Sequence, residues 1–117
     1  MSLLEQLTSD SGQSKNKTIT PQQARQIMDE SSEWILLDVR TPNEYAQIRI
    51  HGAKLIPIHE LSNRAPIELP DKHIPVLIYC HSGARSAGAV KTLTQMGYTN
   101  ALDFGGIIHW PYETTNG

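Results

Sequence analysis

The sequence is poor in cysteine: Cys80 is the only one in 117 residues. A single cysteine excludes an intramolecular disulfide and any metal site built from several thiolates, and it fits a reducing compartment. No apolar run approaches the roughly 18 residues of a membrane span, and the first ten residues lack the basic start and apolar stretch of a secretory signal. We therefore expect a cytoplasmic protein that does not enter a membrane.

The sequence also lacks an excess of charge of either sign. Ten Lys and Arg residues oppose 12 Asp and Glu residues, for a net charge of -2 at pH 7. This balance argues against a basic surface for nucleic acid or anionic lipid. Because there is no global field, an anionic substrate has to be held by local groups. The length allows one compact domain with a core that needs no disulfide or metal.

Metal-ligand spacing is absent as well. The histidines have no cysteine partner and are not arranged as zinc ligands are, so we expect no metal site. They are His51, His59, His73, His81 and His109.

The N-terminal region differs in composition from the rest of the chain. Residues 1–17 are rich in Ser, Gln, Asn and Lys, and their apolar side chains beyond Met1 are Leu3, Leu4 and Leu7. One helical turn without a partner is marginal in water, so a frayed terminus is favoured over a docked helix. We expect a flexible tail over residues 1–17 and an ordered domain over residues 18–117.

Strand and helix patterns alternate from residue 18 onward. The apolar runs at 34–39 and 76–79 show no polar alternation, which is typical of strands covered on both faces in a parallel sheet. Further short strands are expected at 18–20, 54–57 and 101–103. This alternation predicts an α/β fold, with a central parallel sheet of about five strands and helices on both faces.

Helix signals separate these strands. Thr20, Pro21 and Gln23 form a capping-box pattern at the start of one helix. Helices are also expected at 42–47 and at 59–67, the latter ended by Pro66 and Pro70. A longer helix after Cys80 has Ala87, Val90, Leu93 and Met96 on one side and Gly97 as its left-handed cap, and a turn at Gly105 and Gly106 precedes a last short helix at 107–110.

The segment from 76 to 86 carries the clearest chemical signal. A buried strand runs into Cys80 and then into a glycine-containing loop, residues 80–86, which leads into a helix. Such a loop turns backbone N–H groups toward one point and forms an anion site. Lowering a thiol pKa by two units takes about 2.7 kcal/mol, more than the roughly 0.3–1 kcal/mol typical of a helix dipole. The N–H donors and the Arg85 cation must supply the rest.

Two interpretations of Cys80 follow. Most lone cysteines are small buried apolar residues, and Cys80 could be one of them. The spacing of Gly83 and Arg85 after Cys80 favours the other interpretation, a reactive thiolate beside an anion site that needs no separate general base.

The sequence resembles the single-domain rhodaneses, a family of thiosulfate sulfurtransferases. Residues 80–86, Cys-His-Ser-Gly-Ala-Arg-Ser, match the family pattern Cys-x-x-Gly-x-Arg-Ser. The segment Leu-Asp-Val-Arg at 37–40, with Glu44-Tyr45 and Gly52-Ala53, resembles the first family signature. The stretch from Gly97 through Gly105-Gly106 to Trp110 resembles the second.

The resemblance implies a rhodanese-like fold and a sulfurtransferase that works through a Cys80 persulfide. The donor would be thiosulfate or another sulfane-sulfur compound, and the acceptor a thiol, cyanide or a sulfur-accepting protein, with no metal or organic cofactor. The residues expected to bind substrate are those of the loop after the cysteine, namely His81, Ser82, Gly83, Ala84, Arg85 and Ser86.

Several side chains near the loop allow more than one role. Arg85 either points at the substrate or turns to a carboxylate that braces the loop. Asp38 and Arg40 are expected to be structural, capping backbone groups and pairing with residues such as Glu44. His81 could add positive charge or contact an acceptor.

Two other functions are considered. A cysteine-dependent phosphatase places five residues between Cys and Arg and uses a general acid. Here the spacing is four, and Asp38 and Asp103 lack a motif for that role. A non-enzymatic binding module or sulfur-relay partner is the second alternative, and retention of Cys80, Gly83 and Arg85 argues against pure binding.

Overall fold

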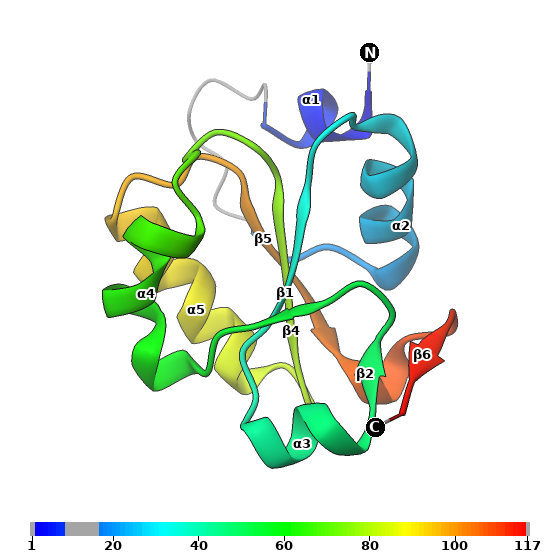
Figure 1. Ribbon diagram of the computed structural model, residues 1–117. Coiled ribbons are helices and arrows are strands. Elements are labelled where there is room, and N and C mark those ends of the chain that lie inside the picture. Colours follow the sequence, from blue (N-terminus) through cyan, green and yellow to red (C-terminus); the bar gives the residue numbers. More distant parts are fainter. Residues whose placement is uncertain (1, 9–16, 117) are drawn as a thin grey trace.

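A four-stranded parallel sheet lies at the centre of the structure, between two layers of helices (Figure 1). The computed structural model describes residues 2–8 and 17–116. In chain order the elements are α1 (Leu3–Thr8), α2 (Pro21–Glu30), β1 (Ile35–Asp38), α3 (Pro42–Gln47), β2 (Arg49–Ile50), β3 (Lys54–Leu55), η1 (Ile58–Glu60), α4 (Leu61–Glu68), β4 (Val76–Cys80), α5 (Ala84–Gln95), β5 (Ala101–Gly106), η2 (Ile107–His109) and β6 (Thr114–Thr115).

The strand order confirms the expected α/β class with a parallel sheet. The main sheet runs β3-β1-β4-β5, so β1 and β4 are its central strands. The fifth predicted strand, at 18–20, contributes a single parallel bridge between Thr18 and Asp103. A second, two-stranded antiparallel sheet of β2 and β6 was not expected from the sequence.

The strands are buried on both faces, as their unbroken apolar runs predict. One face packs under α4 and α5, and its cluster includes Leu37, Ile78 and Leu93. The other face packs under α2, and its cluster includes Leu36 and Leu77. Successive residues of one strand point to opposite faces, so both must be apolar when both faces are covered.

Helix α2 begins as its capping pattern predicts. Thr20 accepts the Gln23 N–H at 3.0 Å, and the Gln23 side chain accepts the Thr20 N–H at 2.9 Å. Pro21 occupies the first turn, and Ala24 and Ile27 are fully buried. The predicted helix at 42–47 is also confirmed, as α3.

Two details of the predicted helices are wrong. Pro66 lies inside α4 and does not end it, because N–H groups after the proline still bond back along the helix. The helix ends at Glu68, and the Leu69 N–H donates to the Ala65 carbonyl just before Pro70. In α5, Val90 and Leu93 are buried and Met96 packs against the same apolar cluster, as predicted, but Ala87 is exposed. Ser86 and Ala89 face inward instead, because they lie four residues before Val90 and Leu93, respectively, on the same side of the helix.

The N-terminal segment differs from the expected frayed terminus where the structure describes it. Leu3, Leu4 and Leu7 lie in α1 and pack against the apolar cluster under α2. The Leu3 N–H also donates to the Glu30 carboxylate at 2.8 Å, which ties α1 to the end of α2. Contacts with the domain replace the missing partner that made a lone turn marginal. The rest of the expected tail, 9–16, lies outside the described residues.

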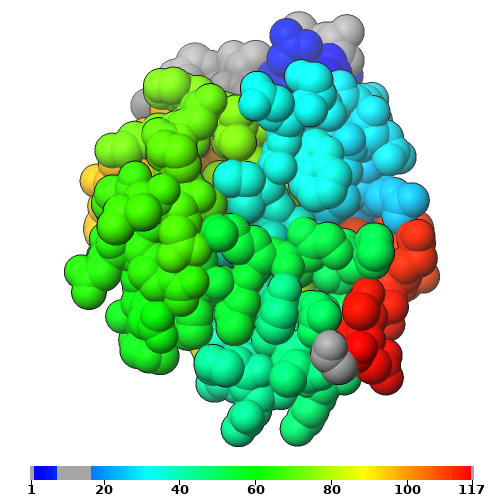
Figure 2. Space-filling model, in the orientation of Figure 1, coloured from blue at the N-terminus to red at the C-terminus, as the bar shows by residue number. Residues whose placement is uncertain are grey.

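The C-terminal segment packs against the middle of the chain. Figure 2 shows the red C-terminal residues lying against the green segment that contains β2, and β6 pairs with β2 through Arg49–Thr115 and Ile50–Thr114. Over residues 2–8 and 17–116, no helix is long and apolar enough to cross a membrane.

Candidate active site

Cys80 is the last residue of β4, at the carboxyl end of a central strand. In open α/β sheets this edge is where sites form, because loops from neighbouring parallel strands meet there. Cys80 is 1% exposed, and His81 and Ser82, which follow it, are exposed on the outside of the loop. The thiol therefore lies at the inner end of the 80–86 loop.

Backbone donors from the start of α5 converge on the Cys80 sulfur. The Gly83 N–H donates to Sγ at 2.9 Å. Gly83 is the N-cap of α5 and has φ of 117°, a left-handed conformation that a side chain would strain. The first N–H groups of a helix have no partner within the helix, so here they are free to bind an anion.

The pKa of Cys80 lies below the ordinary value of a thiol. Burial acts most strongly and would raise the pKa, because it penalises the charged form. Hydrogen bonds from the Ser86 side chain and from the backbone N–H groups of Ser86, Gly83 and Arg85 together outweigh burial. The helix start and Ser86 thus favour the thiolate, the form that is nucleophilic.

Glycines of β5 form the support beneath the loop. A Cβ at Gly106 would overlap the His81 carbonyl and lie 2.6 Å from the Ser82 Cα, so the loop can sit here only against a glycine. Gly105 has φ of 97°. The predicted Gly105–Gly106 turn is therefore the end of β5, and its role is to let the 80–86 loop approach the sheet.

Arg85 pairs with a carboxylate of a neighbouring helix. Its Nη1 and Nη2 donate to Glu44 Oε1 and Oε2 at 2.8 and 2.9 Å. This two-pronged bond joins the first turn of α5 to the first turn of α3. The Arg85 guanidinium holds the pKa of Glu44 down at about 2. Of the two roles left open by the sequence, this geometry is the bracing one.

Asp38 and Arg40 form a buried ion pair at the end of β1. Arg40 Nη2 lies 2.7 Å from Asp38 Oδ2, and the two side chains are 2% and 0% exposed. Arg40 also donates to the Ile48 carbonyl at 2.6 Å. The partner expected for Arg40, Glu44, is occupied by Arg85, so Arg40 links β1 to the residue before β2 instead.

Ser86 lies beneath the sulfur. Its Oγ is 3.5 Å from Cys80 Sγ and 2.6 Å from Asp103 Oδ1, and the residue is fully buried. Ala84 is exposed and begins α5. The loop residues expected to bind substrate therefore divide. The backbone N–H groups of Gly83, Arg85 and Ser86 and the Ser86 hydroxyl act on the sulfur. The other three residues, His81, Ser82 and Ala84, are exposed.

A groove runs beside the loop. It has a volume of about 560 Å³. His81 of the loop lines it, together with residues between 40 and 48 and between 107 and 114. Ile48 and Ile108, two of the three exposed large apolar residues in the described chain, both line it. The space beside the loop exceeds what a small inorganic anion fills.

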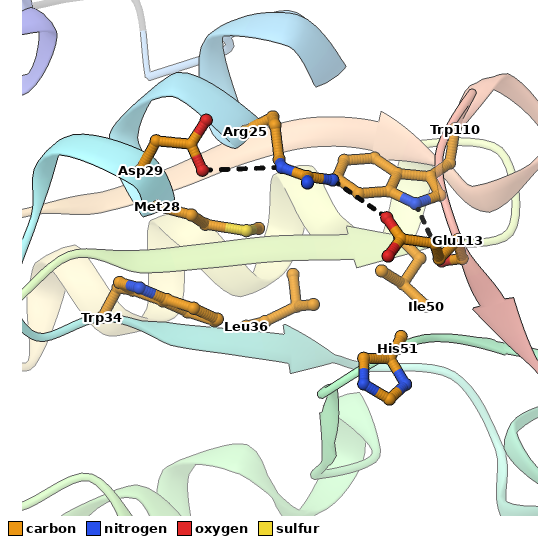
Figure 3. Close-up of a pocket in the computed structure, with 9 residues that line it drawn as sticks. All are labelled: Arg25, Met28, Asp29, Trp34, Leu36, Ile50, His51, Trp110 and Glu113. Atoms are coloured by element: carbon orange, nitrogen blue, oxygen red, sulfur yellow. Dashed lines mark hydrogen bonds and ion pairs between the residues drawn. The ribbon is translucent and has the colours of Figure 1, made fainter.

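A second cavity, of about 220 Å³, lies between α2 and the C-terminal segment (Figure 3). Arg25 reaches Glu113 of the C-terminal segment at 3.2 Å and pairs with Asp29 of its own helix at 3.6 Å, and the Trp110 indole N–H donates to the Glu113 carbonyl. No residue of the 80–86 loop lines this cavity. In residues 2–8 and 17–116, no cluster of His, Cys, Asp or Glu is arranged to hold a metal ion.

Sequence reasoning missed two partners of the loop. The sequence offers Glu44 as a partner for Asp38 and Arg40, yet the Thr-Pro-Asn-Glu pattern at 41–44 is a capping box that fixes this carboxylate. For Asp103 the sequence indicates no contact with the loop. Its contact with Ser86 spans 17 residues and leaves no local sequence signal.

Comparison with known proteins places this chain in a family. A family model for the rhodanese-like domain matches residues 20–110. The chain is 39% identical over 77 residues to the thiosulfate sulfurtransferase PspE of Escherichia coli, covering 66% of this chain and 72% of that protein. It is 31% identical over 109 residues to the thiosulfate sulfurtransferase GlpE of Pseudomonas fluorescens, covering 89% and 96%.

A solved structure agrees with this family assignment. A rhodanese from E. coli with bound anions superposes with a TM-score of 0.69 at 34% identity, over 73% of this chain and all of that one. The fold, the loop at the end of β4 and these similarities together show that the chain belongs to the rhodanese-like family.

Proposed function

We propose that this protein is a sulfurtransferase that carries a sulfane sulfur on Cys80. The observation that supports this most directly is the Cys80 sulfur itself, which receives the Gly83 N–H at 2.9 Å at the start of α5. Its lowered pKa increases the thiolate fraction at neutral pH. The relatives named as thiosulfate sulfurtransferases support the same reaction class.

In the loading step, the Cys80 thiolate attacks the outer sulfur of thiosulfate or of another sulfane donor. A bond forms between Sγ and that sulfur while the donor's sulfur–sulfur bond breaks, and the rest of the donor, which is sulfite when the donor is thiosulfate, leaves with the electron pair. The product is a persulfide whose terminal sulfur carries negative charge. The N–H groups of the 80–86 loop stabilise this charge as an oxyanion hole stabilises an oxygen.

In the discharge step, an external acceptor removes the outer sulfur. A thiolate or cyanide attacks the terminal sulfur, and Cys80 leaves as a thiolate. Because the sequence holds no second cysteine, an internal disulfide cannot release the sulfur. The acceptor is therefore a separate molecule, either a small nucleophile or a protein thiol, and it reaches the loop from the side of the exposed residues His81 and Ser82.

The pairing of Arg85 with Glu44 assigns Arg85 a supporting role in this reaction. The pair fixes the first turn of α5 and with it the N–H groups that point at Sγ. The Asp38–Arg40 pair supports the neighbouring strand end in the same way. Neither pair holds substrate in this proposal.

The test is the rate of thiocyanate formation from thiosulfate and cyanide, measured for the wild type and for Cys80→Ser. We expect activity that Cys80→Ser abolishes while its circular dichroism spectrum stays that of the wild type. Hydrolysis of an aryl phosphate by the wild type, with no thiocyanate formed, would instead establish a phosphatase. Absence of both activities would favour a binding module and overturn the proposal.

A further inference from the structure

A buried carboxylate lies under the 80–86 loop and has no part in the reaction described above. Asp103 is in β5 and is 5% exposed. Its Oδ1 accepts the Gly105 N–H at 2.8 Å and faces Ser86 Oγ at 2.6 Å. Both of these donors are neutral. A carboxylate in such surroundings is costly to bury, so its contact with the group beneath Cys80 calls for a function.

The Ser86 hydroxyl has one proton and several acceptors around it. Asp103 Oδ1 is 2.6 Å away, the Gly83 and Gly105 carbonyls are at 3.0 and 3.4 Å, and Cys80 Sγ is at 3.5 Å. The shortest contact is also the charged one, and charge-assisted bonds are the strongest. While Cys80 is a neutral thiol, the proton therefore points to Asp103, and the Ser86 oxygen can accept the thiol proton.

A thiolate reverses this requirement. Sulfur without a proton can only accept, so Ser86 favours the thiolate only when its own proton turns toward Sγ. That turn breaks the bond to Asp103, whose Oδ1 keeps the Gly105 N–H as a partner. Asp103 and the Cys80 thiolate thus compete for the same proton.

We propose that Asp103 is a positioning residue that holds the Ser86 proton away from Cys80 while the sulfur is neutral and yields it when the sulfur is charged. The inference rests on the proposed function for its place in the reaction. During loading, Sγ changes from a thiolate to a neutral sulfur bonded to the transferred sulfur, and the Ser86 O–H rotates to donate to Asp103. During discharge, Sγ becomes a thiolate again, and the Ser86 O–H rotates to donate to Sγ.

The competition predicts the direction of a substitution. Asp103→Asn keeps an oxygen at Oδ1 but removes the charge, so Ser86 is held less tightly and donates to the thiolate more readily. The rate of Cys80 alkylation by iodoacetamide should then follow a profile displaced to lower pH by about half a unit to one unit, the size of one redirected hydrogen bond. A purely structural role would loosen the loop, lose donors and displace the profile to higher pH.

The other charged and titratable groups near the sulfur are unchanged in Asp103→Asn. They are Arg85 with its partner Glu44 on α3, Asp38 with its partner Arg40 at the end of β1, and His81 within the loop.

A matched control exists elsewhere in the chain. Asp71 is exposed, and its Oδ1 accepts the His73 N–H at 2.9 Å, the same spacing of two residues as in Asp103 and Gly105. Asp71→Asn likewise removes a carboxylate that accepts the N–H two residues further on, but at an exposed position outside the helices and strands, with no serine beneath a cysteine. Its alkylation profile should coincide with that of the wild type.

Ser86→Ala separates the hydroxyl route from simple removal of negative charge. Alone, it should displace the profile to higher pH, because the thiolate loses a donor. In the Ser86→Ala background, Asp103→Asn should cause a smaller displacement than in the wild type. Equal displacements in both backgrounds, no displacement in Asp103→Asn, or one to higher pH would overturn the proposal.

The experiment does not depend on sulfur transfer. Alkylation reports ionisation of Cys80 even if thiosulfate is not a substrate, so a failed sulfurtransferase assay leaves this test intact. If Asp103→Asn does not fold, Ser86→Ala can still overturn the proposal, because an unchanged profile in that variant would exclude Ser86 as the donor.

Discussion

Helices α2 and α3 begin with the same capping device, yet only α3 is joined to the 80–86 loop. In α2 the device is Thr20, Pro21 and Gln23; in α3 it is Thr41, Pro42 and Glu44. Each threonine accepts the N–H of the third helical residue, and each third residue accepts the N–H of the threonine. The two starts differ chemically in that third residue.

A carboxylate offers an arginine two charged acceptor oxygens, whereas an amide offers one neutral oxygen and an NH2 donor. In Gln23 the one side-chain oxygen accepts the Thr20 N–H. Glu44 Oε1 accepts both the Thr41 N–H at 3.0 Å and Arg85 Nη1 at 2.8 Å, and Oε2 accepts Arg85 Nη2. One change of residue type thus converts a local helix start into a support for the loop that carries Cys80.

Arg85→Met cuts this link from the loop side and leaves both caps in place. A charged, two-pronged hydrogen bond contributes about 1.5–3 kcal/mol, so thiocyanate formation should fall by about 10- to 100-fold. Arg25→Met is the control, since it removes an arginine paired with Glu113 and Asp29 far from the loop. Equal losses in both variants, or none in Arg85→Met, would contradict a specific role for Arg85.

Exchanging the third residues tests the comparison directly. Glu44→Gln makes the start of α3 like that of α2: the cap remains and the charge is lost. We expect thiocyanate formation to fall by about 10-fold, the low end of the range for a charged hydrogen bond. The reciprocal Gln23→Glu should leave the rate unchanged, because no arginine of the loop faces it. A loss caused by Gln23→Glu would show that α2 also supports the site.

Thr41→Ala and Thr20→Ala remove the caps themselves. Each should lower the free energy of unfolding by about 1 kcal/mol, the usual contribution of an N-cap hydroxyl, as measured by urea denaturation. Thr41→Ala should also slow thiocyanate formation slightly, because Glu44 loses one of the contacts that orient it. Equal activity in the two variants would mean that Arg85 alone positions Glu44.

The smallest predicted effect is on the free energy of unfolding at acid pH. Arg85 depresses the pKa of Glu44 from 4.5 to about 2 in the folded protein, so the ionised carboxylate stabilises the fold above pH 4.5, and this contribution is lost as the pH falls toward 2. The difference in urea midpoint between wild type and Glu44→Gln should therefore shrink as the pH is lowered through this window. A difference independent of pH would contradict the ion pair.

Local patterns predicted the parts of the fold that local physics determines. The capping box at Thr20, the helix at 42–47 and the strands around Leu37 and Leu77 each follow from a few adjacent residues. The cysteine loop was likewise predicted from the strand–loop–helix order, and the structure brings the Gly83 N–H onto the sulfur.

Contacts between segments far apart in the chain could not be predicted from the sequence. The leucines of α1 are ordered by the cluster under α2, and β2 exists because β6 pairs with it. In the candidate site, Arg85 allowed two roles until the structure placed Glu44 beside it, 41 residues away. The contact between Asp103 of β5 and Ser86 of α5 could not be predicted either, because nothing in either segment alone specifies the pairing.

The central claim is that Cys80 carries the transferred sulfur. Incubating the full-length protein with thiosulfate and recording its intact mass without reductant tests this most directly. We expect a species heavier by one sulfur atom, absent in Cys80→Ser and removed from the wild type by cyanide. A wild-type mass that stays unchanged, or an added sulfur that persists in Cys80→Ser, would contradict the account.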